Sequence, residues 1–190
     1  MEYVLEACVD SVESAIAAQQ GGAKRVELCG NLIIGGTSPG KALFQAVRKY
    51  TDLEIRVLLR PRFGDFCYDE YEFEIMKEDV QMYRELGADG IVTGILLPDG
   101  RLDSVRMGEL IREAGNADVA LHRAFDVCSD PYETLEGAVD LGIKTILTSG
   151  QKNSAWEGRE LLRELVRRSD GRIEILVGAG ISPETIEKLV

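Results

Sequence analysis

The sequence lacks the features that mark membrane, secreted and nucleic-acid-binding proteins. No apolar run approaches the roughly 18 residues that span a bilayer, and the first residues have no basic segment of the kind that opens a signal peptide. The formal net charge is −11, which excludes the broad basic surface that nucleic acids and anionic membranes require. We therefore expect a soluble cytoplasmic protein that binds neither nucleic acid nor membrane.

Cysteine and histidine are scarce, and this narrows the chemistry. The four cysteines form no CxxC pair and no regular spacing, so we expect reduced thiols rather than a disulfide framework or a structural zinc site. The single histidine cannot supply the ligands of the histidine-rich metallohydrolase barrels. No lysine falls at a predicted strand end, which excludes a Schiff-base aldolase.

What the chain does have is a strict alternation of short apolar strands and longer amphipathic helices. Glycines stand where helices should stop, at Gly22, Gly87 and Gly142. Each of Ser38, Asp130 and Ser182 precedes a proline, as at a helix start. The predicted strands cover 3–8, 25–29, 54–60, 90–94, 118–122, 145–149 and 172–178. The predicted helices cover 11–20, 39–50, 70–86, 103–114, 131–141 and 156–168, with a last one beginning near Pro183.

Repeating βα order predicts a parallel sheet with helices outside it. An open sheet would have continuous apolar strands, whereas these strands alternate apolar residues with charged ones such as Glu27, Arg56 and Glu174. One strand face therefore meets a polar interior, which favours a TIM-type (β/α) barrel over an open sheet. We predict a single α/β barrel domain over residues 1–190. The sequence shows about seven βα units and a complete barrel has eight, so the eighth unit is expected to be missing from this chain.

Residues that carry chemistry gather after the predicted strands, where the active face of such barrels lies. These strand ends carry seven motifs: LEACVDSVESA, GGAKRVELC, LLRPRFGDFCY, DGIVTGIL, HRAFDVCSDP, TILTSG and GAGIS. In these motifs the chain resembles the CutC family, which is named for copper homeostasis. The motifs follow one another along essentially the whole sequence. The resemblance implies a cytosolic TIM-type barrel, a homo-oligomer and copper as a ligand, with members that continue into an eighth strand and a tail.

Two cysteines are the candidate metal ligands. Cys8 and Cys29 end neighbouring strands, where their side chains could approach one ion, and thiolates are soft ligands that suit Cu(I). The family resemblance implies copper at the same two positions. The alternative is that both are small buried residues at the barrel rim.

A second interpretation is an enzyme that acts on a small anionic substrate bearing phosphate or carboxylate, so enzymatic activity stays open. Arginine forks grip such anions, and helix-capping glycine turns offer backbone amides. The alternatives are internal ion pairs and tight turns. For this interpretation the candidate catalytic residues are His122, Asp65, Asp126 and Glu27, and the candidate substrate-binding residues are Arg60, Arg62, Arg123, Ser149, Gly150, Gly178 and Gly180.

Overall fold

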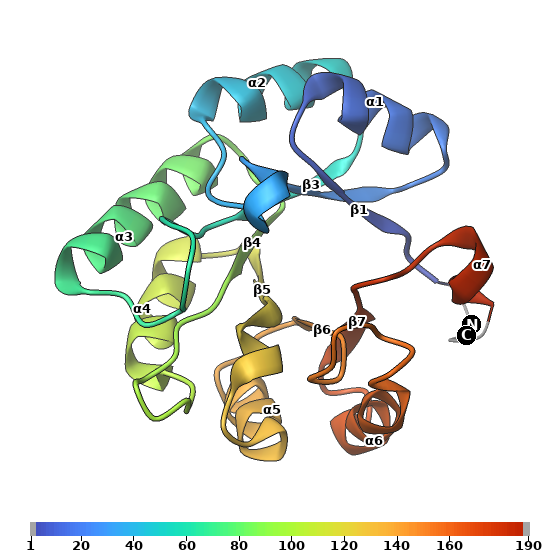
Figure 1. The fold of residues 1–190 in the computed structure, drawn as a ribbon. Helices are drawn as coiled ribbons and strands as arrows, with labels where there is room; N and C mark the ends of the chain where they lie inside the picture. Colours follow the sequence, from blue (N-terminus) through green and yellow to red (C-terminus); the bar gives the residue numbers. More distant parts are fainter. Residues whose placement is uncertain (1–2, 188–190) are drawn as a thin grey trace. The chain divides into compact units, whose positions relative to one another are not determined.

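A computed structural model describes residues 3–187 of the chain. It confirms the predicted α/β class, with the βα order of a TIM-type barrel (Figure 1). The strands are β1 (Glu6–Val9), β2 (Arg25–Leu28), β3 (Glu54–Leu58), β4 (Gly90–Thr93), β5 (Asp118–Leu121), β6 (Thr145–Thr148) and β7 (Glu174–Val177). The helices are α1 (Val12–Gln20), α2 (Lys41–Tyr50), α3 (Glu70–Glu85), α4 (Ser104–Ala114), α5 (Pro131–Asp140), α6 (Arg159–Ser169) and α7 (Pro183–Ile186). Two short 3-10 helices, η1 (Leu32–Ile34) and η2 (Arg123–Val127), follow β2 and β5 and were not predicted.

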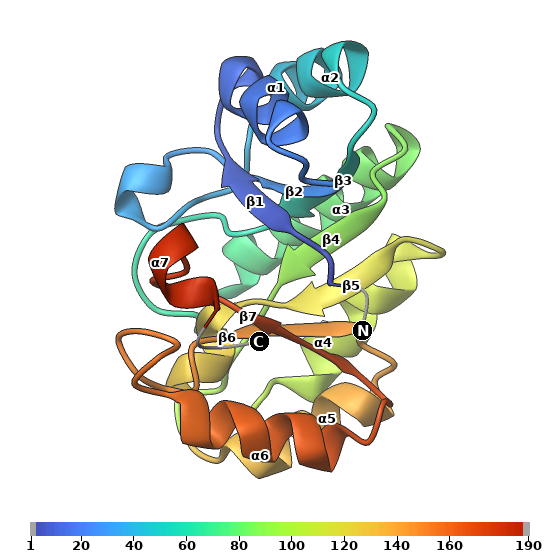
Figure 2. The same ribbon diagram turned by 90° about the vertical axis from the view of Figure 1, so that its right-hand side faces the viewer.

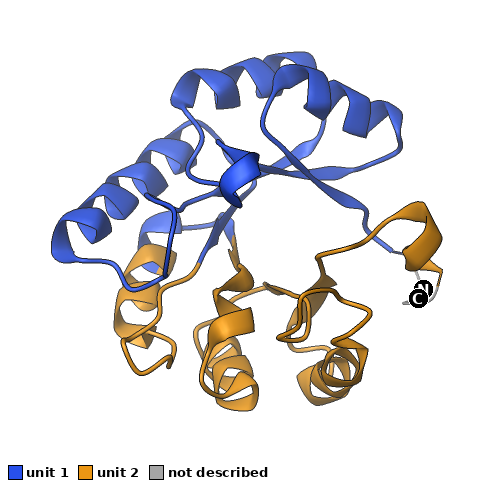
Figure 3. Cartoon of the chain, viewed as in Figure 1, with its two compact units in different colours: residues 1–93, 112–118 blue, residues 94–111, 119–190 orange. Residues whose placement is uncertain are grey.

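The chain divides into two compact units, which Figure 3 colours separately. The first unit comprises residues 1–93 and 112–118, and the second comprises 94–111 and 119–190. The single domain inferred from the sequence stays a prediction.

In the first unit, β1, β2, β3 and β4 pair in parallel in that order. The register sets Glu6 opposite Arg25, and Arg25 opposite Glu54. In the second unit, β6 pairs in parallel with both β5 and β7. These pairings confirm the parallel arrangement that the βα order predicts.

The helices bury their apolar faces, as their periodicity requires. In the first unit α2 buries Phe44 and α3 buries Tyr83, and the two rings meet edge to face with centroids 5.6 Å apart. In the second unit α5 and α6 lie side by side (Figures 1 and 2) and bury Leu135 and Leu165. No helix in residues 3–187 is long and apolar enough to cross a membrane.

Glycine stops confirm the sequence analysis, whereas one predicted helix start is wrong. Gly22, Gly87 and Gly142 have φ angles of +92°, +78° and +75°, the left-handed conformation of a helix end. The pair Ser38-Pro39 does not begin a helix, because α2 starts at Lys41. Ser38 is occupied elsewhere: its amide donates to the carbonyl of Arg60 at 2.9 Å, and its hydroxyl accepts from the Arg60 amide at 3.0 Å.

Charged side chains on β2 and β3 are buried, as the alternating pattern predicts. Arg25, Glu27 and Arg56 are 5%, 4% and 3% exposed. Successive strand residues face opposite sides of the sheet, and the intervening Val26 and Ile55 are fully buried on the other face. Burial of charge requires partners, and the partners define the site.

Candidate functional site

Cys8, Glu27 and Cys29 form a chain of contacts on β1 and β2. Cys8 lies directly opposite Glu27 in the parallel register. Cys29 comes two residues after Glu27, directly after the end of β2, and therefore lies on the same face of the sheet as Glu27. The Cys8 thiol donates to Glu27 Oε2 at 3.3 Å, while the Cys29 thiol contacts the Glu27 carbonyl oxygen at 3.6 Å. The two cysteines therefore lie diagonally, with Glu27 between them.

Burial governs the acidity of all three groups. Desolvation, followed by the charge of Glu6, raises the pKa of Glu27 from 4.5 to about 7. Desolvation, followed by the charge of Glu27, raises the pKa of the Cys8 and Cys29 thiols. Cys29 is buried, whereas Cys8 is exposed as a residue but turns its sulfur toward Glu27. At neutral pH both thiols are protonated and Glu27 is poised to gain or lose a proton.

The arginines nearer the strand starts are internally paired. Arg25 forms an ion pair with Glu6 and lies 3.7 Å from Glu54. Arg56 lies 3.4 Å from Glu54 and 3.8 Å from Asp118. These residues build the interior of the unit, because a buried charge left unpaired costs several kcal/mol.

Arg62, in the loop after β3, forms ion pairs with Asp65 of the same loop and with Glu72 of α3. Arg62 Nε donates to Glu72 at 2.5 Å, and Arg62 Nη2 donates to Asp65 Oδ1 at 3.0 Å. These bonds raise the pKa of Arg62 and lower that of Asp65. Arg62 also donates to the carbonyls of Phe63, Asp65 and Cys67. Its guanidinium is thus committed within the loop.

Arg60 is different, because no carboxylate pairs with it among residues 3–187. Its guanidinium donates to the carbonyls of Gly35, Gly36 and Gly64, at 3.3, 3.2 and 2.8 Å. The residue is only 8% exposed. It stands between the η1 segment and the loop after β3.

His122, in the second unit, follows β5 and begins η2. It is 4% exposed, and its Nδ1 accepts from the amide of Ala124 at 3.2 Å. An accepting Nδ1 carries no proton, so the proton of the neutral ring lies on Nε2. Gly94 packs against this ring: a Cβ there would lie 2.7 Å from His122 Cε1 and Nδ1. Gly94 was not predicted as a site residue, although a glycine at a strand end signals a close approach.

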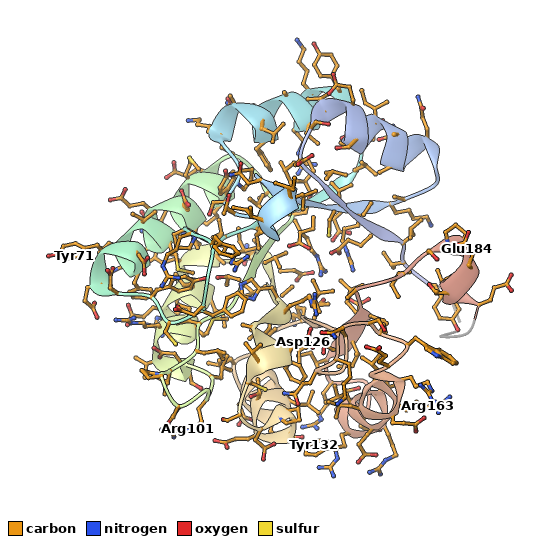
Figure 4. All side chains as sticks on the ribbon, viewed as in Figure 1. Tyr71, Arg101, Asp126, Tyr132, Arg163 and Glu184 are labelled. Carbon is orange, nitrogen blue, oxygen red and sulfur yellow. The ribbon has the colours of Figure 1, made fainter. Side chains whose placement is uncertain are left out.

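Asp126, labelled in Figure 4, is the centre of a hydrogen-bond cluster around the loop after β6. Its carboxylate accepts from the Thr148 hydroxyl at 2.5 Å, from the amide of Ser149 at 3.1 Å and from the amide of Gln151 at 3.1 Å. Arg123 Nε donates to it at 2.7 Å. These bonds outweigh desolvation and lower the pKa of Asp126. The carboxylate thus takes the amide of Ser149, one of the residues predicted to bind an anion.

The predicted glycine turns are tightly packed. The amide of Gly150 donates to Thr148 Oγ1 at 2.9 Å, and a Cβ on Gly150 would lie 2.4 Å from the carbonyl oxygen of Gly158. A Cβ on Gly178 would meet Leu147 at 2.6 Å, and Gly180 has a φ of +73°. Close packing and backbone conformation thus account for these three glycines.

The structure sorts the predicted residues into two groups. Cys8, Glu27, Cys29, Arg60, Arg62 and Asp65 belong to the first unit, and His122, Arg123, Asp126, Ser149, Gly150, Gly178 and Gly180 to the second. Glu72 and Gln151 are partners that the sequence did not reveal, because both come from outside the strand-end motifs. In residues 3–187 no group of three or more His, Cys, Asp or Glu side chains is arranged to hold a metal ion.

Known proteins with similar sequences match this chain over nearly its whole length. A curated relative from Histophilus somni, named family protein CutC, is 42% identical over 98% of this chain and 76% of its own length. The copper homeostasis protein cutC homolog of Mus musculus is 40% identical over 99% of this chain and 69% of its own length. The solved structure of a copper homeostasis protein CutC from Streptococcus agalactiae is 31% identical, covers 98% of this chain and 93% of that one, and superposes with a TM-score of 0.93.

More distant structures show the fold alone. A phosphoenolpyruvate phosphomutase from Streptomyces platensis is 12% identical, covers 94% of this chain and 77% of its own, and has a TM-score of 0.60.

The family model described as "CutC family" matches residues 3–190. The chain belongs to the CutC family.

Proposed function

We propose that this chain takes part in copper handling and binds Cu(I) through Cys8 and Cys29. Relatives named for copper homeostasis support a copper-related role. The observation that carries the proposal is the placement of both thiols on one face of adjacent parallel strands, each in contact with Glu27. Soft thiolates suit Cu(I), and a site of two thiolates needs no larger ligand cluster.

Binding at this pair requires two changes. Diagonal neighbours on adjacent strands have Cα atoms about 8 Å apart from strand spacing and rise, so both sulfurs must turn from Glu27 toward one ion. Both thiols are protonated at neutral pH, so binding of Cu(I) releases protons. The affinity therefore rises with pH.

The test is a Cu(I) titration of fully reduced protein against a competing chelator. We expect the wild type to bind one Cu(I) and the Cys8→Ser/Cys29→Ser variant to bind at least a hundredfold more weakly. The matched control is Cys67→Ser/Cys128→Ser, which also removes two thiols of the chain and should bind as the wild type does. Equal affinity of the Cys8→Ser/Cys29→Ser variant and the wild type would refute the site.

A further inference from the structure

Three arginines that follow strands are candidate anion binders: Arg60 and Arg62 after β3, and Arg123 after β5. Their partners in the structure differ. Arg62 is committed to Glu72 and Asp65, and Arg123 is committed to Asp126. Arg60 forms no ion pair within residues 3–187, although it is 8% exposed. A guanidinium does not lose its proton. The fold therefore buries a full positive charge that no acidic side chain of the described chain neutralises.

The donors of Arg60 are only partly used. A guanidinium has five N–H groups, and three glycine carbonyls accept from Nη1 twice and from Nη2 once. These bonds leave one donor on Nη2 and one on Nε. The side chain also hydrogen-bonds the Tyr68 hydroxyl, whereas the Nε atom is buried with no partner of normal hydrogen-bond geometry in residues 3–187. These two nitrogens share one edge of the planar group. Such an edge matches the two oxygens of a carboxylate or phosphate.

The surroundings of the guanidinium hold it rigidly in place. Its Cζ lies 5.0 Å from the centroid of the Phe66 ring, a stacking distance. Desolvation raises the pKa of the buried Tyr68 hydroxyl to about 12, and the nearby charge of Arg60 opposes that rise. A fixed, desolvated guanidinium loses little entropy when it binds an anion.

The loop after β3 contributes the Gly64 carbonyl and the Phe66 ring to the surroundings of Arg60. At the tip of this loop, Gly64 has a φ of +110° and Phe63 is 65% exposed. The η1 segment, which precedes Gly35 and Gly36, carries Ile33, and this side chain is 97% exposed. An anion at the Nε edge would supply the counter-charge that no acidic side chain of residues 3–187 gives to Arg60.

We propose that Arg60 is a binding site for the carboxylate or phosphate group of a small molecule. The site adjoins Cys29, because a Cβ on Gly36, whose carbonyl accepts from Arg60, would lie 3.6 Å from the Cys29 sulfur. The proposal does not depend on copper binding, since none of the donors is a thiol.

The experiment measures anion binding by the metal-free, reduced wild type. Inorganic phosphate and malonate are the probes, and sodium chloride of equal ionic strength separates specific binding from screening. We expect a saturable rise of the unfolding midpoint with at least one probe, and the probe with the lower Kd identifies the group. The Arg60→Lys variant keeps the charge and loses the fork, and it should bind at least tenfold more weakly. The matched control is Arg62→Lys, which should bind as the wild type does.

Two results overturn the proposal: no saturable effect beyond that of chloride, or equal Kd values for Arg60→Lys and the wild type. If Arg60→Lys does not fold, the wild type alone decides. The Arg60 Nε–H signal in a ¹⁵N spectrum, assigned through its proximity to Phe66, should shift with bound probe. A titration that moves other arginine signals and leaves this one in place also overturns the proposal.

Discussion

Replacement of Glu27 by glutamine tests how strongly the fold of the first unit perturbs a buried acid. The pKa of Glu27 is raised from 4.5 to about 7, first by desolvation and then by Glu6. Between these pH values the folded chain holds a proton at Glu27 and the unfolded chain does not. The free energy of unfolding of the wild type therefore falls as the pH rises.

The size of the effect follows from the same two values. Each pH unit across the interval lowers the free energy of unfolding by about 1.4 kcal/mol, so Glu27 costs about 3 kcal/mol of stability above pH 7. Glu27→Gln keeps the shape of the side chain and an oxygen that accepts from Cys8, but it cannot ionise. The variant should exceed the wild type by less than about 1 kcal/mol at pH 5 and by about 3 kcal/mol at pH 8.

The assay is urea unfolding of the metal-free, reduced proteins at several values from pH 5 to pH 8. The matched control is Glu136→Gln, which removes an exposed acid paired with Arg172. Bonds from Arg172 lower the pKa of Glu136, so its contribution is already constant above pH 5. A difference between Glu27→Gln and the wild type that stays constant across the range would refute the reasoning, because it would mean that Glu27 titrates at its ordinary value.

Two further changes test the second unit. Gly94→Ala places a Cβ 2.7 Å from the His122 ring and should lower the free energy of unfolding by about 1–3 kcal/mol, because the ring is displaced. Denaturant unfolding measures this loss, and the ring-proton NMR signal of the only histidine should move. An unchanged signal together with unchanged stability would contradict the packing. Asp126→Asn removes the charge that accepts from Arg123 and from Ser149 and should cost about 2–3 kcal/mol near neutral pH, with the difference shrinking on acidification because the pKa of Asp126 is lowered. Asp99→Asn, in an exposed pair, is its control, and equal losses in the two variants would count against the Asp126 cluster.

The βα order followed from periodicity and glycine stops, which are local properties. Each strand needs only alternating apolar residues and each helix an apolar stripe, so both are visible in a short window. The helix start at Ser38 was wrong because a distant residue, Arg60, takes the hydrogen bonds of Ser38. The two 3-10 helices were missed because each is a single short turn without a repeating pattern.

The sequence by itself predicted where the candidate site residues lie along the chain. Residues at strand ends in parallel βα units meet on one edge of the sheet, so Cys8, Cys29 and His122 could be singled out without coordinates. The family motifs are equally local, and the comparisons bear them out over residues 3–190.

Tertiary structure alone decided which charges are neutralised. Arg60 and Arg62 are two residues apart in one motif. Glu72 of α3 pairs with Arg62, whereas Arg60 forms no ion pair within residues 3–187 and donates to glycine carbonyls. The register of β1 and β2 likewise placed Glu27 between the two cysteines. Pairing and burial depend on side chains from distant segments of the chain. These interactions leave Arg60 buried without an ion pair in residues 3–187, and they leave Glu27 buried with a raised pKa.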